Sequence, residues 1–151
     1  MAEKVTLDTN ILIYTVDPRD PLRQTMALEI VKHAAATKAA LTTISLGEFF
    51  WAASRKFKLD KTYLRQQLHD FAVLFDTTGY DTTDLFRGAQ ESEAGRFEFW
   101  DAVMLSAADR AGCTVCLSED MHDGAKLGGI TVRNPFGARG ISDAARPALG
   151  L

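Results

Sequence analysis

Four acidic residues lie where one predicted secondary-structure element ends and the next begins: Asp8, Glu48, Asp101 and Asp120. In an alternating strand–helix chain, strand ends and the following helix starts share one edge of the sheet, so the four carboxylates meet there. Like-charge repulsion opposes such a group unless a cation neutralises it. The usual cation for an all-oxygen cluster is Mg²⁺ or Mn²⁺. The pattern therefore predicts a metal-dependent enzyme acting on phosphates.

Each acid also has a structural interpretation, and these remain open at this point. Asp8 and Asp101 suit the first turn of a helix, where a carboxylate caps backbone N–H groups or meets the helix dipole. Glu48 follows Ser45 at the spacing of a capping box, and Asp120 lies in a polar loop. Independent caps do not explain why all four positions are acidic, whereas a metal centre does.

Rival chemistries lack their required residues. A haloacid-dehalogenase phosphatase places a second Asp two residues after the first, but Asn10 stands at that position after Asp8. The chain has neither a GxxxxGK[ST] nor a GxGxxG loop for a nucleotide. None of its three histidines lies in the context of a serine triad. A phosphoryl-aspartate enzyme, a nucleotide-binding enzyme and a serine hydrolase are therefore disfavoured.

Composition describes an ordinary globular domain. The chain has 151 residues, 46% hydrophobic and 25% charged, with a net charge of −3, which suits one domain with a substantial core. This net charge neither indicates nor excludes binding to a nucleic acid. No signal peptide or membrane-spanning stretch is apparent, so we expect a cytoplasmic protein without membrane contact. Cys116 lies in the strand expected over 114–117 and Cys113 directly precedes it, and both are interpreted as buried reduced thiols.

The elements that must position these acids alternate along the chain. Strands are expected over 4–7, 41–44, 114–117 and 130–133, with a short strand or turn at 75–81. Helices are expected over 10–14, 22–36, 45–57, 62–75, 82–94 and 100–111. This alternation predicts an α/β domain with a largely parallel sheet and helices on both faces. Residues 137–151 carry few large apolar groups, so we expect a flexible or partner-docking tail after a domain spanning 1–136.

Three further expectations concern exposure. Trp100 falls on the predicted buried face of the helix over 100–111. Four acids of the helix over 82–94 and its start are expected on a solvated face: Asp81, Asp84, Glu91 and Glu93. The aromatic residues of the helix over 45–57 are too spread to face one core, so they indicate either a helix sandwiched within the fold or an interface with a partner. They are Phe49, Phe50, Trp51 and Phe57.

Four ordered segments carry a family resemblance: LDTNILIY, ISLGEFF, FWDAVMLSAA and CLSEDMHDG. Together they resemble a PIN domain, in particular the VapC-type toxin of type II toxin–antitoxin systems, over about residues 4–136. The resemblance implies that Asp8, Glu48, Asp101 and Asp120 bind metal. It also implies polar supporting positions at Asn10 and Ser118. Family members differ in whether the last loop adds a second acid, so the resemblance leaves Asp123 open as a further ligand.

The resemblance also implies a function. We expect an Mg²⁺- or Mn²⁺-dependent endoribonuclease that hydrolyses RNA phosphodiester bonds, a cognate antitoxin that blocks its site, and a homodimer. Two alternatives stay open. One is a catalytically weak PIN-like module that binds RNA or protein, and the other is a DNA nuclease with the same metal centre. Metal binding without RNA hydrolysis would favour the first, and competition between RNA and DNA substrates would test the second.

Overall fold

In the computed structural model, which describes residues 3–151, six strands form one sheet in the order β3-β2-β1-β4-β6-β5. The strands are β1 (Val5–Leu7), β2 (Ala40–Thr42), β3 (Asp76–Thr78), β4 (Val115–Leu117), β5 (Lys126–Leu127) and β6 (Ile130–Arg133). The helices are α1 (Thr9–Val16), α2 (Pro21–Ala36), α3 (Thr43–Arg55), α4 (Lys61–Leu74), α5 (Thr82–Glu93) and α6 (Phe99–Arg110), with a short 3₁₀ turn η1 (Pro147–Leu149).

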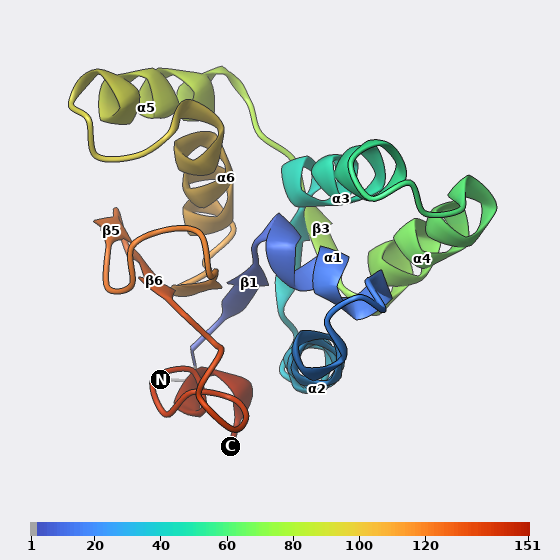
Figure 1. The fold of residues 1–151 in the computed structure, drawn as a ribbon. Coiled ribbons are helices and arrows are strands. Elements are labelled where there is room, and N and C mark those ends of the chain that lie inside the picture. The colour runs from blue at the N-terminus through green and yellow to red at the C-terminus, as the bar shows by residue number, and fades with distance from the viewer. Residues whose placement is uncertain (1–2) are drawn as a thin grey trace.

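The sheet is parallel from β3 through β6, and only β5 pairs antiparallel with its neighbour β6. Figure 1 shows α1, α2, α3 and α4 on one side of the sheet and α5 and α6 on the other. The expected α/β class, with a largely parallel sheet and helices on both faces, is confirmed. The expectation missed β5, a strand of two residues that lies inside the predicted polar loop.

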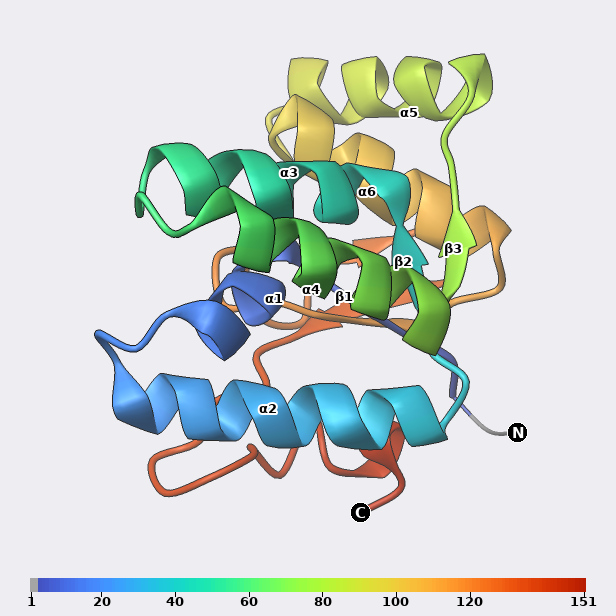
Figure 2. The same cartoon turned by 90° about the vertical axis from the view of Figure 1, so that its right-hand side faces the viewer.

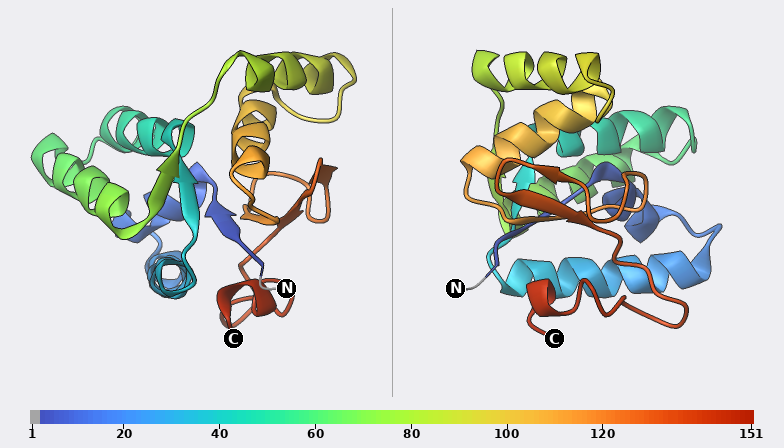
Figure 3. Two further views of the ribbon diagram at one scale, coloured as in Figure 1. Left: turned by 180° about the vertical axis from the view of Figure 1, so that it is seen from behind. Right: turned by 90° about the vertical axis from the view of Figure 1, so that its left-hand side faces the viewer.

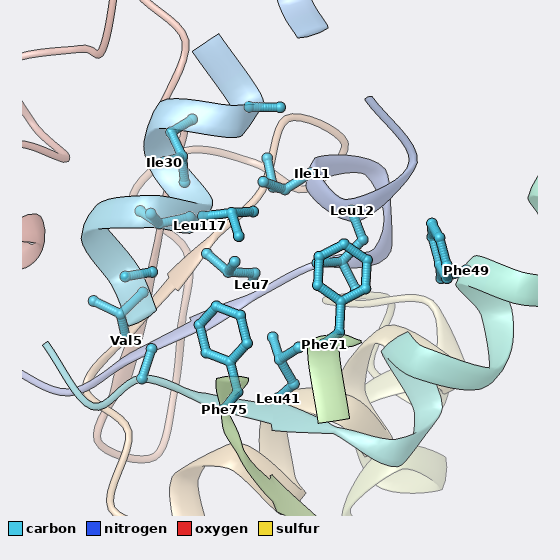
Figure 4. Close-up of a cluster of buried hydrophobic side chains, with 14 of the residues drawn as sticks. Val5, Leu7, Ile11, Leu12, Ile30, Leu41, Phe49, Phe71, Phe75 and Leu117 are labelled. Carbon is cyan, nitrogen blue, oxygen red and sulfur yellow. The ribbon is translucent and has the colours of Figure 1, made fainter. Parts of the chain in front are cut away.

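Successive strand residues face opposite sides of the sheet and so build two hydrophobic clusters. Leu7, Leu41 and Leu117 belong to the larger cluster, together with Phe49 and Phe71 from α3 and α4. Figure 4 shows these side chains converging above the strands. Cys116, the neighbour of Leu117, belongs instead to the smaller cluster beneath α6. The strands are thus buried on both faces, as a parallel sheet requires.

Both cysteines are packing residues. Cys113 and Cys116 are buried free thiols, which agrees with the expectation. Burial raises the pKa of the Cys113 thiol to about 11 and raises that of Cys116 further above its usual range. Neither side chain therefore forms a reactive thiolate near neutral pH.

The carboxyl-terminal segment, expected as a flexible or partner-docking tail, packs partly on the domain. Ala145, Ala148 and Leu149 are buried and belong to the larger hydrophobic cluster. Figures 2 and 3 show the segment, in red, running along α2. The segment has too few apolar residues to fold alone. A few small side chains and one leucine are nevertheless enough for it to pack on α2. A domain boundary at residue 136 stays a prediction.

Two exposure expectations were wrong. Trp100 is 48% exposed because it lies in the first turn of α6, ahead of the turns that pack on the sheet. Asp84 is fully buried, because it pairs with Arg110 and Ser106 of α6 rather than facing solvent. On α3, Phe49 is buried and Trp51 is 52% exposed, so the aromatic residues of this helix divide between core and surface.

None of the helices within residues 3–151 combines the length and the apolar character needed to cross a membrane.

Candidate metal centre

Asp8 directly follows β1, and two hydrogen bonds hold its carboxylate at the sheet edge. It is the N-cap of α1, and its Oδ1 accepts a 2.7 Å hydrogen bond from the Thr9 backbone N–H. Its Oδ2 accepts a second 2.7 Å bond from the Ser118 hydroxyl. Burial nevertheless raises the pKa of Asp8, against the lowering effect of these two bonds. The capping interpretation is therefore correct, and it leaves a buried carboxylate that a cation would stabilise.

Ser118 connects Asp8 to the loop that follows β4. Its side chain is buried, and its Oγ accepts hydrogen bonds from the backbone N–H groups of Asp120 and Met121, at 3.2 and 3.3 Å. The same hydroxyl donates to Asp8. One serine therefore orients the Asp8 carboxylate and sets the turn on which Asp120 is carried.

Glu48 reaches the site from α3. The helix begins at Thr42, whose side chain caps the Ser45 N–H, so the expected capping box between Ser45 and Glu48 does not form. The Glu48 carboxylate is free of the helix start and instead accepts a 3.2 Å bond from the Thr9 hydroxyl. This contact joins α3 to the first turn of α1, beside Asp8.

Asp101 shows that the four predicted acids have been brought together. Its pKa is raised to about 7, first by burial and then by the charges of Asp8, Glu48 and Asp120. Glu98, the N-cap residue of α6, adds a smaller repulsion that sequence reasoning did not identify. Four carboxylates from four separate segments therefore repel one another across one site, which is costly unless a cation compensates.

Asp123 lies outside this group. Its Oδ1 accepts a 2.9 Å hydrogen bond from the Asn134 backbone N–H, which ties the loop after β4 to the end of β6. Asp123 is also not among the charges that raise the pKa of Asp8 or Asp101. That Asp123 binds metal stays a prediction. The contact that the structure shows for its carboxylate is the hydrogen bond from Asn134.

Asn10 is present at the site with its polar atoms unused. Both atoms of its side-chain amide are buried, and within residues 3–151 neither has a hydrogen-bond partner. Leaving such groups unpaired costs free energy. Asn10 lines a hollow of about 340 Å³ that Asp120 also lines. The expected supporting role of Asn10 therefore has an unpaired donor and acceptor to act with.

Three hollows adjoin the acidic group. The first, about 400 Å³, is lined by Asp101 and Asp120, and the second, about 330 Å³, by Glu48 and Trp100. The third is the hollow with Asn10 and Asp120, and Lys56 lies on its wall. Glu48, Asp101 and Asp120 therefore each border a hollow, whereas the buried Asp8 lines none of the three.

The chemistry of the donor set fits a hard divalent cation. All four side chains offer carboxylate oxygens, and the buried Asp8 gains most from neutralisation. Within residues 3–151, no group of three or more acidic, histidine or cysteine side chains is arranged so that it could hold a metal ion. Mg²⁺ commonly uses only one or two carboxylates and keeps several waters, so such a group is not required. The residues present suit an ion held by few direct ligands.

Sequence reasoning missed Thr9, Lys56 and Tyr80. Thr9 had a signal, because it lies between Asp8 and Asn10 and its hydroxyl can reach a neighbouring helix. No sequence signal identified Lys56 or Tyr80. Lys56 lines the same hollow as Asp120, and Tyr80 lines the same hollow as Glu48. Both positions depend on how α3 and the connection after β3 pack.

No protein-family model matches the sequence, and neither does any curated protein. Solved structures do match the fold. A toxin–antitoxin complex from Klebsiella pneumoniae superposes with a TM-score of 0.59 at 20% identity, covering 88% of this chain and 98% of that chain. VapC20 of Mycobacterium tuberculosis, described as a Sarcin-Ricin loop cleaving toxin, gives 0.58 at 13% identity over 78% and 90%. VapBC2 from Rickettsia felis, bound to a promoter DNA fragment, gives 0.60 at 18% identity over 86% and 97%.

These identities are low, and the coverage is nearly complete on both sides. The chain therefore has the PIN-type α/β fold of VapC20 and of the toxin–antitoxin structures that it matches.

Proposed function

We propose that this protein is a metal-dependent endoribonuclease, the toxin of a toxin–antitoxin pair, that hydrolyses RNA phosphodiester bonds. The observation that carries the proposal is the gathering of Asp8, Glu48, Asp101 and Asp120 at one sheet edge. Ser118 joins Asp8 to the turn of Asp120, the Thr9 hydroxyl joins Glu48 to the residue after Asp8, and Asp101 is near enough for the other three charges to raise its pKa. The fold adds support, since a solved structure that shares it is described as a Sarcin-Ricin loop cleaving toxin.

Asp8 and Asp101 are the proposed direct ligands of Mg²⁺ or Mn²⁺, because they are the two acids whose pKa values burial and repulsion raise. A bound ion of this kind lowers the pKa of a coordinated water and stabilises negative charge on a phosphate. Ser118 holds the Asp8 carboxylate in place and so acts as a positioning residue.

The remaining polar residues act on water and substrate. Glu48 orients the attacking water, held towards the site by the Thr9 hydroxyl. Asp120 completes the acidic group on the far side, and the unpaired Asn10 amide binds a water or a phosphate oxygen. Lys56 lines the same hollow as Asp120 and Asn10, which makes it the candidate contact to the RNA backbone.

We also propose an antitoxin partner and a homodimer. Structures that share this fold include toxin–antitoxin complexes from Klebsiella pneumoniae and Rickettsia felis. The exposed Trp51 of α3, together with Val73 and Leu74 of α4, offers apolar surface for a partner. A cytoplasmic location follows from the proposed RNA substrate and partner. Chromatography of the chain alone and co-expressed with its neighbouring gene product would test both assemblies.

A cleavage assay tests the nuclease proposal. Wild type and Asp101→Asn are stripped with EDTA, and each is given a fluorogenic RNA, or its DNA counterpart, with Mg²⁺ or Mn²⁺ added back. We expect metal-restored cleavage of RNA by wild type and at least a hundredfold less by the variant. Equal cleavage by both proteins would indicate a contaminant and reject the proposal. Preferential cleavage of DNA would identify the DNA nuclease alternative, and metal binding with no hydrolysis would identify the binding module.

A further inference from the structure

Two exposed aromatic side chains lie beside the acidic group, and the proposed chemistry does not use them. Tyr80 is 43% exposed and Trp100 is 48% exposed. Tyr80 comes from the connection between β3 and α5, and Trp100 from the first turn of α6. Exposed rings of this size cost hydration free energy, and at a nuclease site their usual role is to contact substrate.

The two rings are held in a fixed arrangement. Their centroids are 5.8 Å apart with the planes at 73°, so they pack edge to face. Trp100 also packs against Phe99 at 4.9 Å and the same interplanar angle. Because the indole packs against two rings, its orientation is restrained, and a ligand stacking on its exposed surface pays less of the entropy of ordering it.

The hollow beside these rings is open and has a mixed lining. Its volume is about 330 Å³, and its walls are Thr43, Ile44, Gly47, Glu48, Tyr80 and Trp100. Gly47 keeps the floor clear, since a Cβ added there would meet no atom within 4 Å. An occupant therefore meets two aromatic side chains, Tyr80 and Trp100, and two side chains that carry oxygen, Thr43 and Glu48. A planar heterocycle with N–H groups at its edge matches both.

The position of the hollow selects its occupant. Trp100 directly precedes Asp101, and Glu48 belongs to both the hollow and the acidic group. A ring stacked in the hollow would therefore belong to a nucleotide next to the phosphate held at the carboxylates. A base inside a duplex has its faces covered by its neighbours and its edge paired, so only an unpaired or extruded base fits.

We propose that Tyr80 and Trp100 form a stacking subsite for an unpaired nucleobase of the RNA, adjacent to the phosphate that is cleaved. This inference rests on the proposed ribonuclease function and narrows its substrate to single-stranded or loop RNA. The subsite binds by stacking and by a hydrogen bond to Thr43, and its two aromatic rings take no part in the bond-breaking step.

Tryptophan fluorescence tests the subsite without any cleavage. Replacing Trp51 by Phe leaves Trp100 as the only tryptophan, because the chain has two. In EDTA, a short single-stranded RNA is titrated into this protein, and so is the same strand annealed to its complement. We expect saturable quenching by the single strand and little by the duplex. A Gly47→Leu change, which fills the hollow, should abolish the quenching.

Steady-state cleavage of the single strand gives the second readout. Trp100→Ala should raise KM roughly 5- to 150-fold, the range for losing one base–aromatic stack. Trp100→Phe, which keeps a ring, should fall between this variant and wild type. Phe86→Ala is the matched control, because Phe86 is 74% exposed on α5 and lines none of the three hollows. Thermal unfolding of each variant reports whether the fold is intact.

The outcomes separate the subsite from the nuclease function. Cleavage by wild type without quenching, equal quenching by duplex, or an unchanged KM in a folded Trp100→Ala protein would each overturn the subsite and leave the nuclease standing. In those cases the hollow would be assigned to a protein partner. Quenching by single-stranded RNA without cleavage under any metal would reject the nuclease and retain the subsite.

Discussion

At the scale of single residues, the clustered carboxylates lower the free energy of unfolding of the metal-free protein. Burial and four neighbouring carboxylates raise the pKa of Asp101 to about 7. A carboxyl whose pKa is higher in the folded state than in the unfolded chain favours folding less as the pH rises. Such a cost is typical of a binding site and is not explained by helix capping alone.

The Asp101→Asn change should therefore stabilise the metal-free protein. The gain should be absent below about pH 4, where the carboxyl is protonated in both states. It should grow through the interval up to the folded-state pKa of about 7 and reach ~2 kcal/mol above it, after allowing for solvent screening. Urea unfolding in EDTA at several pH values measures this difference. Asp123→Asn is the control, and an equal gain in that variant would contradict the account.

Ser118 gives the second prediction at this scale. Its hydroxyl donates to Asp8 and accepts from the Asp120 N–H. Ser118→Ala removes both contacts and leaves every acid in place. Changing such a supporting group typically weakens metal binding about 10- to 100-fold. Calorimetric titration with Mn²⁺ measures the effect, and unchanged affinity in the folded variant would show that Asp8 needs no such support.

At the scale of elements, α6 carries Trp100 and Asp101, and α5 fixes its position. The two helices approach closely at Gly88, where an added Cβ would lie 2.5 Å from the Val103 Cγ2 atom and 3.2 Å from the Phe99 carbonyl oxygen. A second link is the buried Asp84. Desolvation raises its pKa, but hydrogen bonds from Arg110 and Ser106 outweigh this and lower it to about 2. α5 therefore contacts α6 near its start, at Phe99 and Val103, and near its end, at Ser106 and Arg110.

Gly88→Ala should destabilise the protein by about 1–3 kcal/mol, because the new methyl group overpacks the contact between α5 and α6. Gly47→Ala is the matched control. Gly47 also lies inside a helix, but its Cβ would meet nothing within 4 Å, so the change should stabilise by about 0.5–1 kcal/mol through helix propensity. Urea denaturation of both variants measures the difference. A stability loss that is equal in the two would reject the close contact.

The sequence could predict the elements better than their exposed faces. Hydrophobic spacing and strand-end acids were sufficient for the parallel sheet and for the meeting of Asp8, Glu48, Asp101 and Asp120. Spacing alone could not show that the first turn of α6 projects beyond the sheet and exposes Trp100. The pairing of Asp84 with Arg110 joins residues 26 apart on different helices, and no local pattern reports it.

At the scale of the whole molecule, the carboxyl-terminal segment completes the core that supports the site. Ala145, Ala148 and Leu149 close the larger hydrophobic cluster next to α2. That cluster also contains Leu7 and Leu117, the residues that directly precede Asp8 and Ser118. The segment therefore contributes to the packing behind the acidic group.

Leu149→Ala should destabilise the protein by about 2–4 kcal/mol, through lost burial and the cavity left behind. Leu151→Ala is the control, because Leu151 is 42% exposed while Leu149 is only 2% exposed. Thermal unfolding of the two variants compares them directly. Matching melting temperatures for Leu149→Ala and wild type would show that the segment does not pack on the domain.

Calorimetric titration of Mn²⁺ into the metal-free protein determines whether the carboxylates at the sheet edge hold a divalent cation. We expect saturable binding by wild type, its loss in Asp101→Asn and its retention in Asp123→Asn, because the Asp123 carboxylate of wild type instead accepts a hydrogen bond from the Asn134 N–H. Absence of binding in wild type, or equal binding in Asp101→Asn, would show that these carboxylates do not form a metal site.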